Sequence, residues 1–169
     1  MQDGNERNQD SAIQRFSVTS SKRFHEVVAA IEAAVGHPDM RSFSKNIGVA
    51  KTFPEMEEIV REAIGPSELM EFMRMDLGAF LRKRIGTESW RSMRLIVGNP
   101  IIMSSMMEHV PDVGSYAPVT LLIDERADGV HLSYDRMASF IATYGSHEAL
   151  KIAQDLDSKV EALLAAAAG

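Results

Sequence analysis

The feature that most constrains the fold is a predicted β-hairpin at residues 119–134. Apolar residues recur at every second position, as Val119, Leu121 and Ile123 and again as Val130, Leu132 and Tyr134, as they do in strands with one buried face. Asp128-Gly129 between the two runs is a turn pair that closes tight hairpins. Because the connection is too short for a crossover, the two strands are antiparallel. The hairpin favours an α+β domain with helices on one or both faces of a mixed sheet.

Periodicity elsewhere predicts further strands and helices around this hairpin. The run Leu95-Ile96-Val97 has no polar break, which predicts a central strand covered on both faces. Residues 37–51 contain a proline, a glycine and few periodic apolar positions, and are predicted to form a loop. The predicted strands are 13–20, 69–75 and 92–98, and the predicted helices are 21–35, 52–64, 77–85, 99–110, 135–144 and 146–164.

Capping signals predict where these helices begin and end. Thr52 and Glu55 have the spacing of a capping box, and Pro54 fits a first turn. Gly36 is predicted to end the first helix in a left-handed cap. The predicted N-caps are Ser20 or Ser21, Thr52, Asp76, Asn99, Asp135 and Ser146, and Gly86 is predicted to end the helix 77–85.

Length and composition limit the number of domains and the classes of partner. The 169 residues fit one domain, predicted at 13–167, after a polar tail at 1–12 that is predicted to be disordered. A net charge of −6 argues against a nucleic-acid-binding surface and against anchoring on an anionic membrane. The absence of cysteine excludes thiolate chemistry. With no long apolar run and no apolar leader, we expect a cytoplasmic protein.

The first candidate site is the turn Gly98-Asn99-Pro100, which opens a predicted helix. Backbone N–H groups at a helix start attract an anionic group, although Pro100 removes one of them. The turn lacks the glycine spacing of known phosphate-binding loops. A capped strand-to-helix turn with no ligand is therefore the simpler interpretation.

The second candidate is the methionine-rich helix that follows this turn. Met103 or Met106 together with His109 would suit Cu(I) or a haem iron. Methionine as a filler of an irregular core is the simpler interpretation. The other histidines His25, His37 and His147 include no pair with metal-ligand spacing, so we predict no metal site, and the sequence indicates no particular cofactor.

The third candidate is the polar face of the hairpin. His131 or Tyr134 together with Asp124 or Asp135 could form an oriented general base, which would make the protein an enzyme. A polar strand face that simply meets water is the commoner arrangement in antiparallel sheets. Whether the protein is an enzyme stays open at this point.

An ordered set of motifs resembles the bacterial domain-of-unknown-function family 302. The set covers roughly residues 16–164 and consists of Gly98-Asn99-Pro100, Ala117-Pro118-Val119, Asp128-Gly129 and Tyr134-Asp135. The resemblance implies a single α+β domain of the TATA-binding-protein-like class, with a curved, mainly antiparallel sheet of about five strands packed by helices. It also implies a homodimer. The family brings no established reaction, so no catalytic residue is transferred.

Our leading hypothesis from the sequence is a non-enzymatic domain that binds a small, partly apolar ligand between sheet and helices. Methionine side chains make adaptable pocket walls, and the Gly98–Pro100 turn would hold the polar end of the ligand. The candidate ligand-binding residues are Asn99, Pro100, Met103, Met107, His109, Tyr116 and Tyr134.

Overall fold

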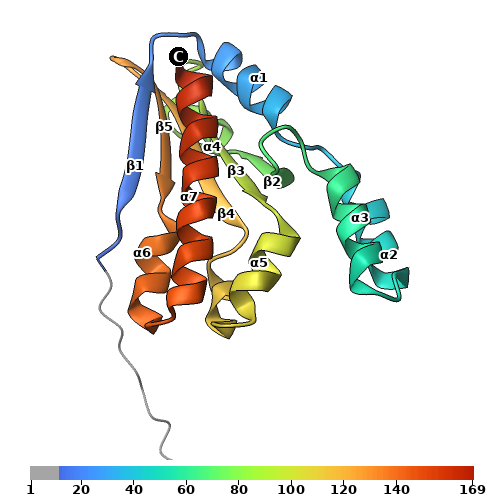
Figure 1. Ribbon diagram of the computed structural model, residues 1–169. Coiled ribbons are helices and arrows are strands. Elements are labelled where there is room, and N and C mark those ends of the chain that lie inside the picture. Colours follow the sequence, from blue (N-terminus) through green and yellow to red (C-terminus); the bar gives the residue numbers. More distant parts are fainter. Residues whose placement is uncertain (1–11) are drawn as a thin grey trace, which may run out of the picture.

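A computed structural model describes residues 12–169, so the predicted tail at 1–12 falls outside it except for its last residue. The chain forms one five-stranded antiparallel sheet in the order β1-β5-β4-β3-β2 (Figure 1). This confirms the predicted α+β fold, although every pairing between the strands is antiparallel and the sheet is not mixed. The strands are β1 (Arg15–Ser20), β2 (Met70–Asp76), β3 (Ser92–Gly98), β4 (Val119–Arg126) and β5 (Gly129–Asp135).

The helices lie mainly on one face of this sheet. The long α7 runs along the strands, α1 and α5 lie beside it, and α2 and α3 pair with each other to one side, beyond β2 (Figure 1). The helices are α1 (Phe24–Ala34), α2 (Met40–Val49), α3 (Phe53–Ala63), α4 (Leu77–Ile85), α5 (Pro100–Met107), α6 (Met137–Ile141) and α7 (His147–Ala168), with 3-10 turns η1 (Pro111–Ser115) and η2 (Ala142–Tyr144). No helix among residues 12–169 is both long and apolar enough to cross a membrane.

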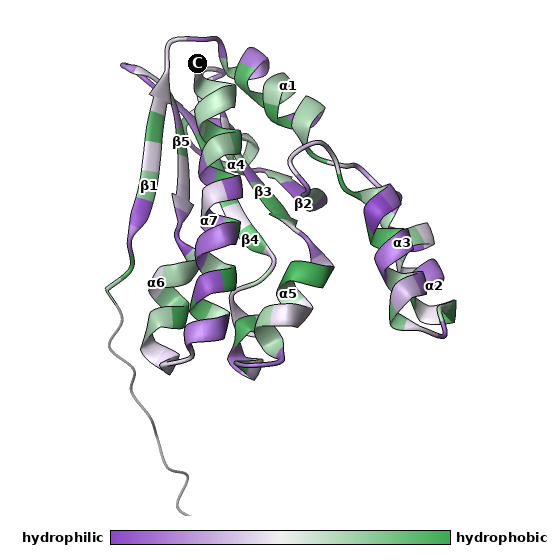
Figure 2. Cartoon of the chain, viewed as in Figure 1, coloured by the Kyte–Doolittle hydropathy of each residue, from purple (hydrophilic) through white to green (hydrophobic). Residues whose placement is uncertain are grey.

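The core lies between the sheet and α7. Leu95, Leu121 and Tyr134 form one row across β3, β4 and β5, and each is at most 1% exposed. Hydrophilic and hydrophobic residues alternate along α7, as expected for a helix with one buried face (Figure 2). The buried positions of α7 are Ala149, Ala153, Leu156, Asp157, Val160, Leu163, Leu164 and Ala167.

The opposite face of the sheet is more polar, and we call it the open face. Alternation along β4 puts Thr120 and Leu122 on this face, where both are half-buried, while their neighbour Leu121 is fully buried. Ile96 on β3 is also only half-buried. The prediction that this strand is interior is confirmed, but its cover on the second face is partial.

One helix was not predicted, because residues 40–49 form α2 rather than a loop. The side chain of Asp39 accepts a hydrogen bond from the backbone N–H of Ser42 and caps this helix. Phe43 is its one buried residue, and it packs with Val60 of α3 in a small second core. A helix that buries so little of its surface leaves only a weak apolar period in the sequence.

Three capping predictions are wrong. The N-cap of α1 is Arg23, since Ser20 is buried and its hydroxyl donates a hydrogen bond to the carbonyl of Ala168. Gly36 does not adopt a left-handed conformation. A glycine is needed there because a Cβ would lie 1.9 Å from the carbonyl oxygen of Ala63. Asp135 is the last residue of β5 and does not cap α6. The predicted caps at Thr52, Asp76, Asn99 and Ser146, and Gly86 as the end of α4, are confirmed.

Candidate functional site

The β3–α5 junction, formed by Gly98, Asn99, Pro100, Met103 and Met106 against Pro118, is tightly packed. The side-chain oxygen of Asn99 accepts hydrogen bonds from the backbone N–H groups of Ile101 and Ile102, at 2.9 and 3.4 Å. Its amide nitrogen donates to the carbonyl of Glu68 at 2.9 Å. The cavity that remains is about 10 Å³, which is the room of a single water molecule.

The methionines and His109 of the second candidate site lie in different surroundings. Met106 is fully buried in the main core, and Met103 and Met107 pack against that core. His109 follows the end of α5 and is exposed. The part of the chain that the structure describes contains no group of three histidine or carboxylate side chains that could hold a metal ion.

The residues of the proposed general base do not come together. The Nε2 atom of His131 lies 2.8 Å from a carboxylate oxygen of Asp128, not of Asp124 or Asp135. Asp124 binds the guanidinium of Arg126 at 2.5 Å. Asp135 accepts two hydrogen bonds from Arg15, which lower the pKa of this carboxyl and hold it in an ion pair.

Tyr134 points to the packed face, where it meets a buried carboxylate that the sequence analysis missed. The carboxylate of Asp157 accepts hydrogen bonds from the Tyr134 hydroxyl at 2.6 Å and from the backbone N–H groups of Met137 and Ala138 at 2.7 and 3.1 Å. It thereby caps the start of α6. Burial raises the pKa of Asp157 and also that of Tyr134. The visible signal was a charged residue inside the apolar stripe of α7, four positions after Ala153.

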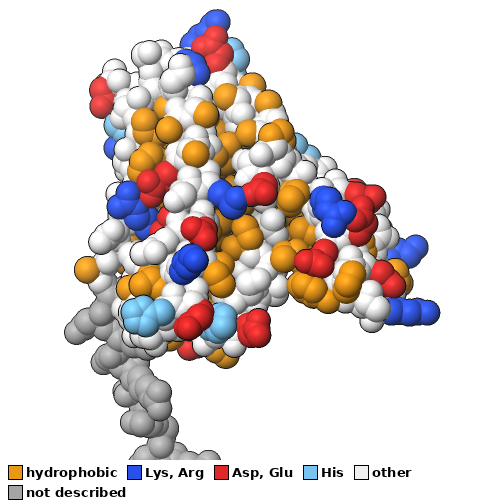
Figure 3. Space-filling view, viewed as in Figure 1, with side chains coloured by type: hydrophobic (Ala, Val, Ile, Leu, Met, Phe, Trp, Pro, Cys, Tyr) orange, Lys and Arg blue, Asp and Glu red, His pale blue; other side chains and the backbone are white. Residues whose placement is uncertain are grey.

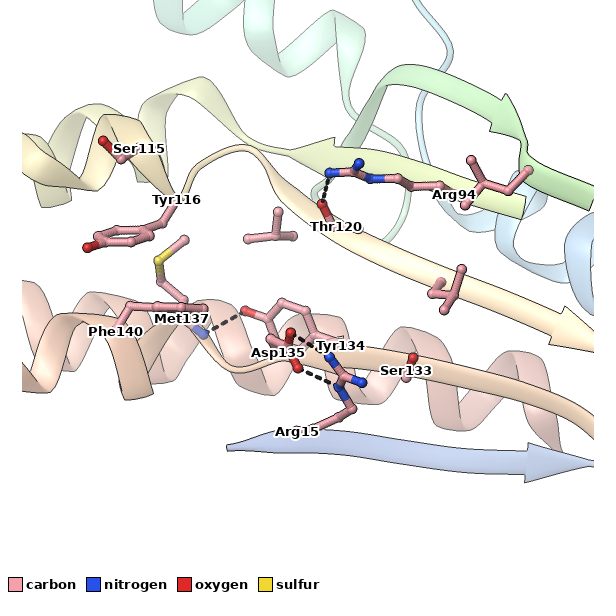
Figure 4. A pocket seen from close by; sticks show the side chains of 13 residues that line it. Arg15, Arg94, Ser115, Tyr116, Thr120, Ser133, Tyr134, Asp135, Met137 and Phe140 are labelled. Atoms are coloured by element: carbon pink, nitrogen blue, oxygen red, sulfur yellow. Dashed lines mark hydrogen bonds and ion pairs between the residues drawn. The ribbon is translucent and has the colours of Figure 1, made fainter. Parts of the chain in front are cut away.

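A much larger cavity, of about 420 Å³, opens on the other face of the sheet, and we call it the open-face pocket. Residues of β3, β4 and β5 form its floor, while η1 and α6 supply a wall at the end of the strands (Figure 4). The residues around it are Arg15, Leu77, Arg94, Ser115, Tyr116, Val119, Thr120, Leu122, Ser133, Tyr134, Asp135, Met137 and Phe140.

The wall of the open-face pocket is aromatic. The rings of Tyr116 and Phe140 stack with their centroids 4.9 Å apart and their planes at 18°. The hydroxyl of Tyr116 lies 2.8 Å from that of Tyr144, and this hydrogen bond, with partial burial, raises the pKa of Tyr144 to about 12. Tyr144 is therefore neutral at physiological pH, and its hydrogen bond to Tyr116 holds the wall in place.

The charges of the pocket are unevenly matched. Arg15 forms its two hydrogen bonds with Asp135, at 2.6 and 2.9 Å. Within residues 12–169, Arg94 donates only to the hydroxyl of Thr120, at 3.2 Å (Figure 4). Two guanidinium groups and one carboxylate leave one net positive charge beside the cavity.

The structure divides the predicted ligand-binding residues between two places. Tyr116 and Tyr134 line the open-face pocket, although the hydroxyl of Tyr134 is turned into the core. Asn99, Pro100 and Met103 line the packed β3–α5 junction, and Met107 and His109 line neither cavity. The sequence analysis missed Arg94, Thr120 and Phe140 as pocket residues. For the two strand residues, the alternation along β3 and β4 was the available signal.

A third hollow lies between α1 and α7 and has a different character. It measures about 550 Å³ and is lined mostly by small apolar residues, among them Ala30, Ala34 and Ala166. Hydrophobic side chains are visible over the upper parts of α1 and α7 (Figure 3). Lys159 and Glu68 form an ion pair at this groove. Because its two charged groups pair with each other and the Ser67 hydroxyl donates to the carbonyl of Ala34, it carries no functional argument.

Comparison with known proteins gives a family and a fold. The family model described as "Domain of unknown function DUF302" matches residues 45–167. The crystal structure of the uncharacterized conserved protein DUF302 from Bacillus stearothermophilus is similar, with a TM-score of 0.62, 14% identity, and coverage of 90% of this chain and 96% of that one. At this identity the likeness shows the fold alone. No protein of the curated set matches this chain.

Proposed function

This chain belongs to the DUF302 family, whose function is unknown, and we propose that it binds a small, partly apolar ligand in the open-face pocket. The observation that carries the proposal is a cavity of about 420 Å³ beside a stacked aromatic pair. Ligand pockets commonly have volumes of a few hundred Å³, with apolar walls and a few polar groups that fix orientation. Arg94, Thr120 and Ser133 are such polar groups.

The choice between the two sheet–helix junctions rests on space. At the β3–α5 junction, both polar atoms of the Asn99 side chain form hydrogen bonds with backbone groups. The space is also filled, since a Cβ on Gly98 would come within 3.2 Å of Pro118. A ligand there would have to displace core side chains, whereas the open-face pocket needs no such displacement. The pocket also has strands for its floor, which favours a rigid, preorganised site.

A screen of the purified full-length protein against small molecules, by thermal shift and native mass spectrometry, tests this proposal. Ser133→Phe would fill the pocket from its floor, and phenylalanine is well tolerated in strands. Thr19→Phe is the matched control, because Thr19 is an exposed strand residue outside the pocket. We expect ligands that stabilise the wild type and Thr19→Phe but not Ser133→Phe. A screen that finds no binding compound, or compounds that stabilise Ser133→Phe as much as the wild type, would overturn the proposal.

We also propose that the protein forms a homodimer through β2 and α4. Large apolar side chains are exposed there: Phe80 is 78% exposed, Met73 55% and Trp90 44%. β2 is an edge strand whose start is bridged by Gly36 at Met70, and beyond this bridge its outer backbone groups pair with no other strand among residues 12–169. Light scattering over a range of concentrations tests this, with Met73→Lys expected to favour the monomer. A wild type that is monomeric at every concentration would refute it.

A further inference from the structure

The ion pairing of the arginines indicates which chemical class of ligand the open-face pocket would bind. Among residues 12–169, most arginines form an ion pair with a carboxylate, but Arg94, Arg41 and Arg84 do not. Arg41 and Arg84 lie on helices and line none of the three cavities described above. Arg94 therefore combines a guanidinium without an anionic partner and a cavity in front of it.

The position of the Arg94 guanidinium suits recognition of an anion. Its Nη2 donates to the Thr120 hydroxyl at 3.2 Å, which leaves its other N–H groups without a protein acceptor in the described part of the chain. In Figure 4 the guanidinium points along the sheet toward Thr120. Thr120 lies near the end of β4 that is closest to the aromatic wall. A guanidinium matches the planar, two-oxygen geometry of a carboxylate.

The remaining charges of the pocket do not compete for that anion. Arg15 is already neutralised by its two hydrogen bonds with Asp135. The protein as a whole carries a net charge of −6, which repels anions at long range. A small anion is therefore selected by the local contact with Arg94 and not by the overall field.

Resting on the proposed function, we propose that the ligand of the open-face pocket is a small aromatic carboxylate. Its carboxylate pairs with Arg94 beside the Thr120 hydroxyl. Its ring lies against the stacked pair of Tyr116 and Phe140, where planar apolar groups pack well. No chemical step is implied, because binding alone accounts for every feature used.

Titration with two probes of nearly equal shape, benzoate and benzamide, followed by NMR on the full chain, tests the inference. We expect the wild type to bind benzoate roughly fivefold more tightly than benzamide, since a charge-assisted pair at an exposed arginine adds a modest factor. Added salt should reduce this preference, because exposed charges are screened.

Arg94→Gln should abolish the preference for benzoate over benzamide, because the substitution removes the positive charge that distinguishes the two probes. Arg84→Gln is the matched control, since it removes the same charge from an arginine that lies outside the pocket and forms no ion pair with the residues that the structure describes. Equal affinity for the two probes in the wild type, or equal effects of the two substitutions, would overturn the inference. Other ligands that are sensitive to Ser133→Phe would then leave the proposed function standing. If the wild type binds neither the two probes nor any other small molecule, both the inference and the proposed function are overturned.

Discussion

The two sheet–helix junctions of this protein make opposite use of their polar residues. At the β3–α5 junction the cavity is about 10 Å³, and Asn99 satisfies backbone groups on both sides. At the open-face pocket the cavity is about 420 Å³, and Arg94 has one hydrogen bond and no ion pair with residues 12–169. The turn at Asn99 therefore stabilises the fold, whereas the open face holds a guanidinium most of whose N–H groups have no acceptor among residues 12–169.

The largest expected effect is a difference in stability between truncating a leucine on the packed face of the sheet and truncating one on the open face. Leu121→Ala should destabilise the protein by about 2–5 kcal/mol, because a fully buried leucine leaves a cavity when truncated. Leu122→Ala, one residue along on the open face, should cost less than about 1 kcal/mol, since that side chain is only half-buried. Urea denaturation of both variants measures the difference. Equal losses would mean that the open face is buried in solution.

The buried carboxylate on the packed side gives the next effect. Asp157→Asn should lower the stability by about 1–2 kcal/mol. The substitution replaces one of the two carboxylate oxygens by an NH₂ group, which cannot accept a hydrogen bond. At least one of the three donors, on Tyr134, Met137 and Ala138, then loses its acceptor.

The cost of Asp157→Asn should also depend on pH. Burial raises the pKa of Asp157, so the stability that this group contributes is fully present below the unfolded pKa of about 3.9 and is lost as pH rises through the folded value. Urea unfolding at pH 4 and pH 7 should therefore show a larger cost at pH 4. A cost that grows between pH 4 and pH 7 would contradict the assignment.

Asn99→Ala separates folding from binding at the packed junction. Loss of the cap should lower the stability of the protein by about 1 kcal/mol, since alanine cannot accept from the first N–H groups of α5. The sequence-based hypothesis expects this variant to weaken ligand binding, whereas the geometry predicts unchanged affinity in the open-face pocket. Thermal unfolding and a ligand titration of the same sample distinguish these outcomes.

The smallest effect concerns the ion pair at the edge of the pocket. Arg15→Gln should cost a few tenths of a kcal/mol, because exposed pairs are well screened by solvent and salt. Asp135, whose pKa Arg15 lowers, contributes stability above its unfolded pKa that is lost as pH falls. Acid titration of both proteins should show the transition of Arg15→Gln at slightly higher pH. An unchanged acid transition would show that the pair contributes nothing to stability.

Much of the fold was predictable because local patterns decide it. The hairpin pattern predicts strands with one buried face, and Leu121 and Leu132 on this face are fully buried. The cap at Asn99 follows from side-chain chemistry alone and is confirmed. α2 was missed because it buries only Phe43.

The candidate site was less predictable because it depends on contacts between distant segments. Asp135 was expected to cap a helix or to serve a histidine, but Arg15, 120 residues away in the chain, takes its carboxylate. Asp157 finds its partners 19 to 23 residues away. That Arg94 has no anionic partner among residues 12–169 is visible only from the positions of the carboxylates in this part of the chain. Sequence patterns identify the faces of a strand but not which of their charges stay unpaired.

The central claim, that ligands bind at the open face and not at the packed junction, is tested most directly by the methionine methyl groups. Met137 lies in the open-face pocket, whereas Met103 and Met106 lie at the β3–α5 junction. In protein labelled with ¹³C at the methionine methyls, added benzoate should shift the Met137 signal and leave those of Met103 and Met106 in place. Shifts at Met103 and Met106 with Met137 unmoved would contradict the account.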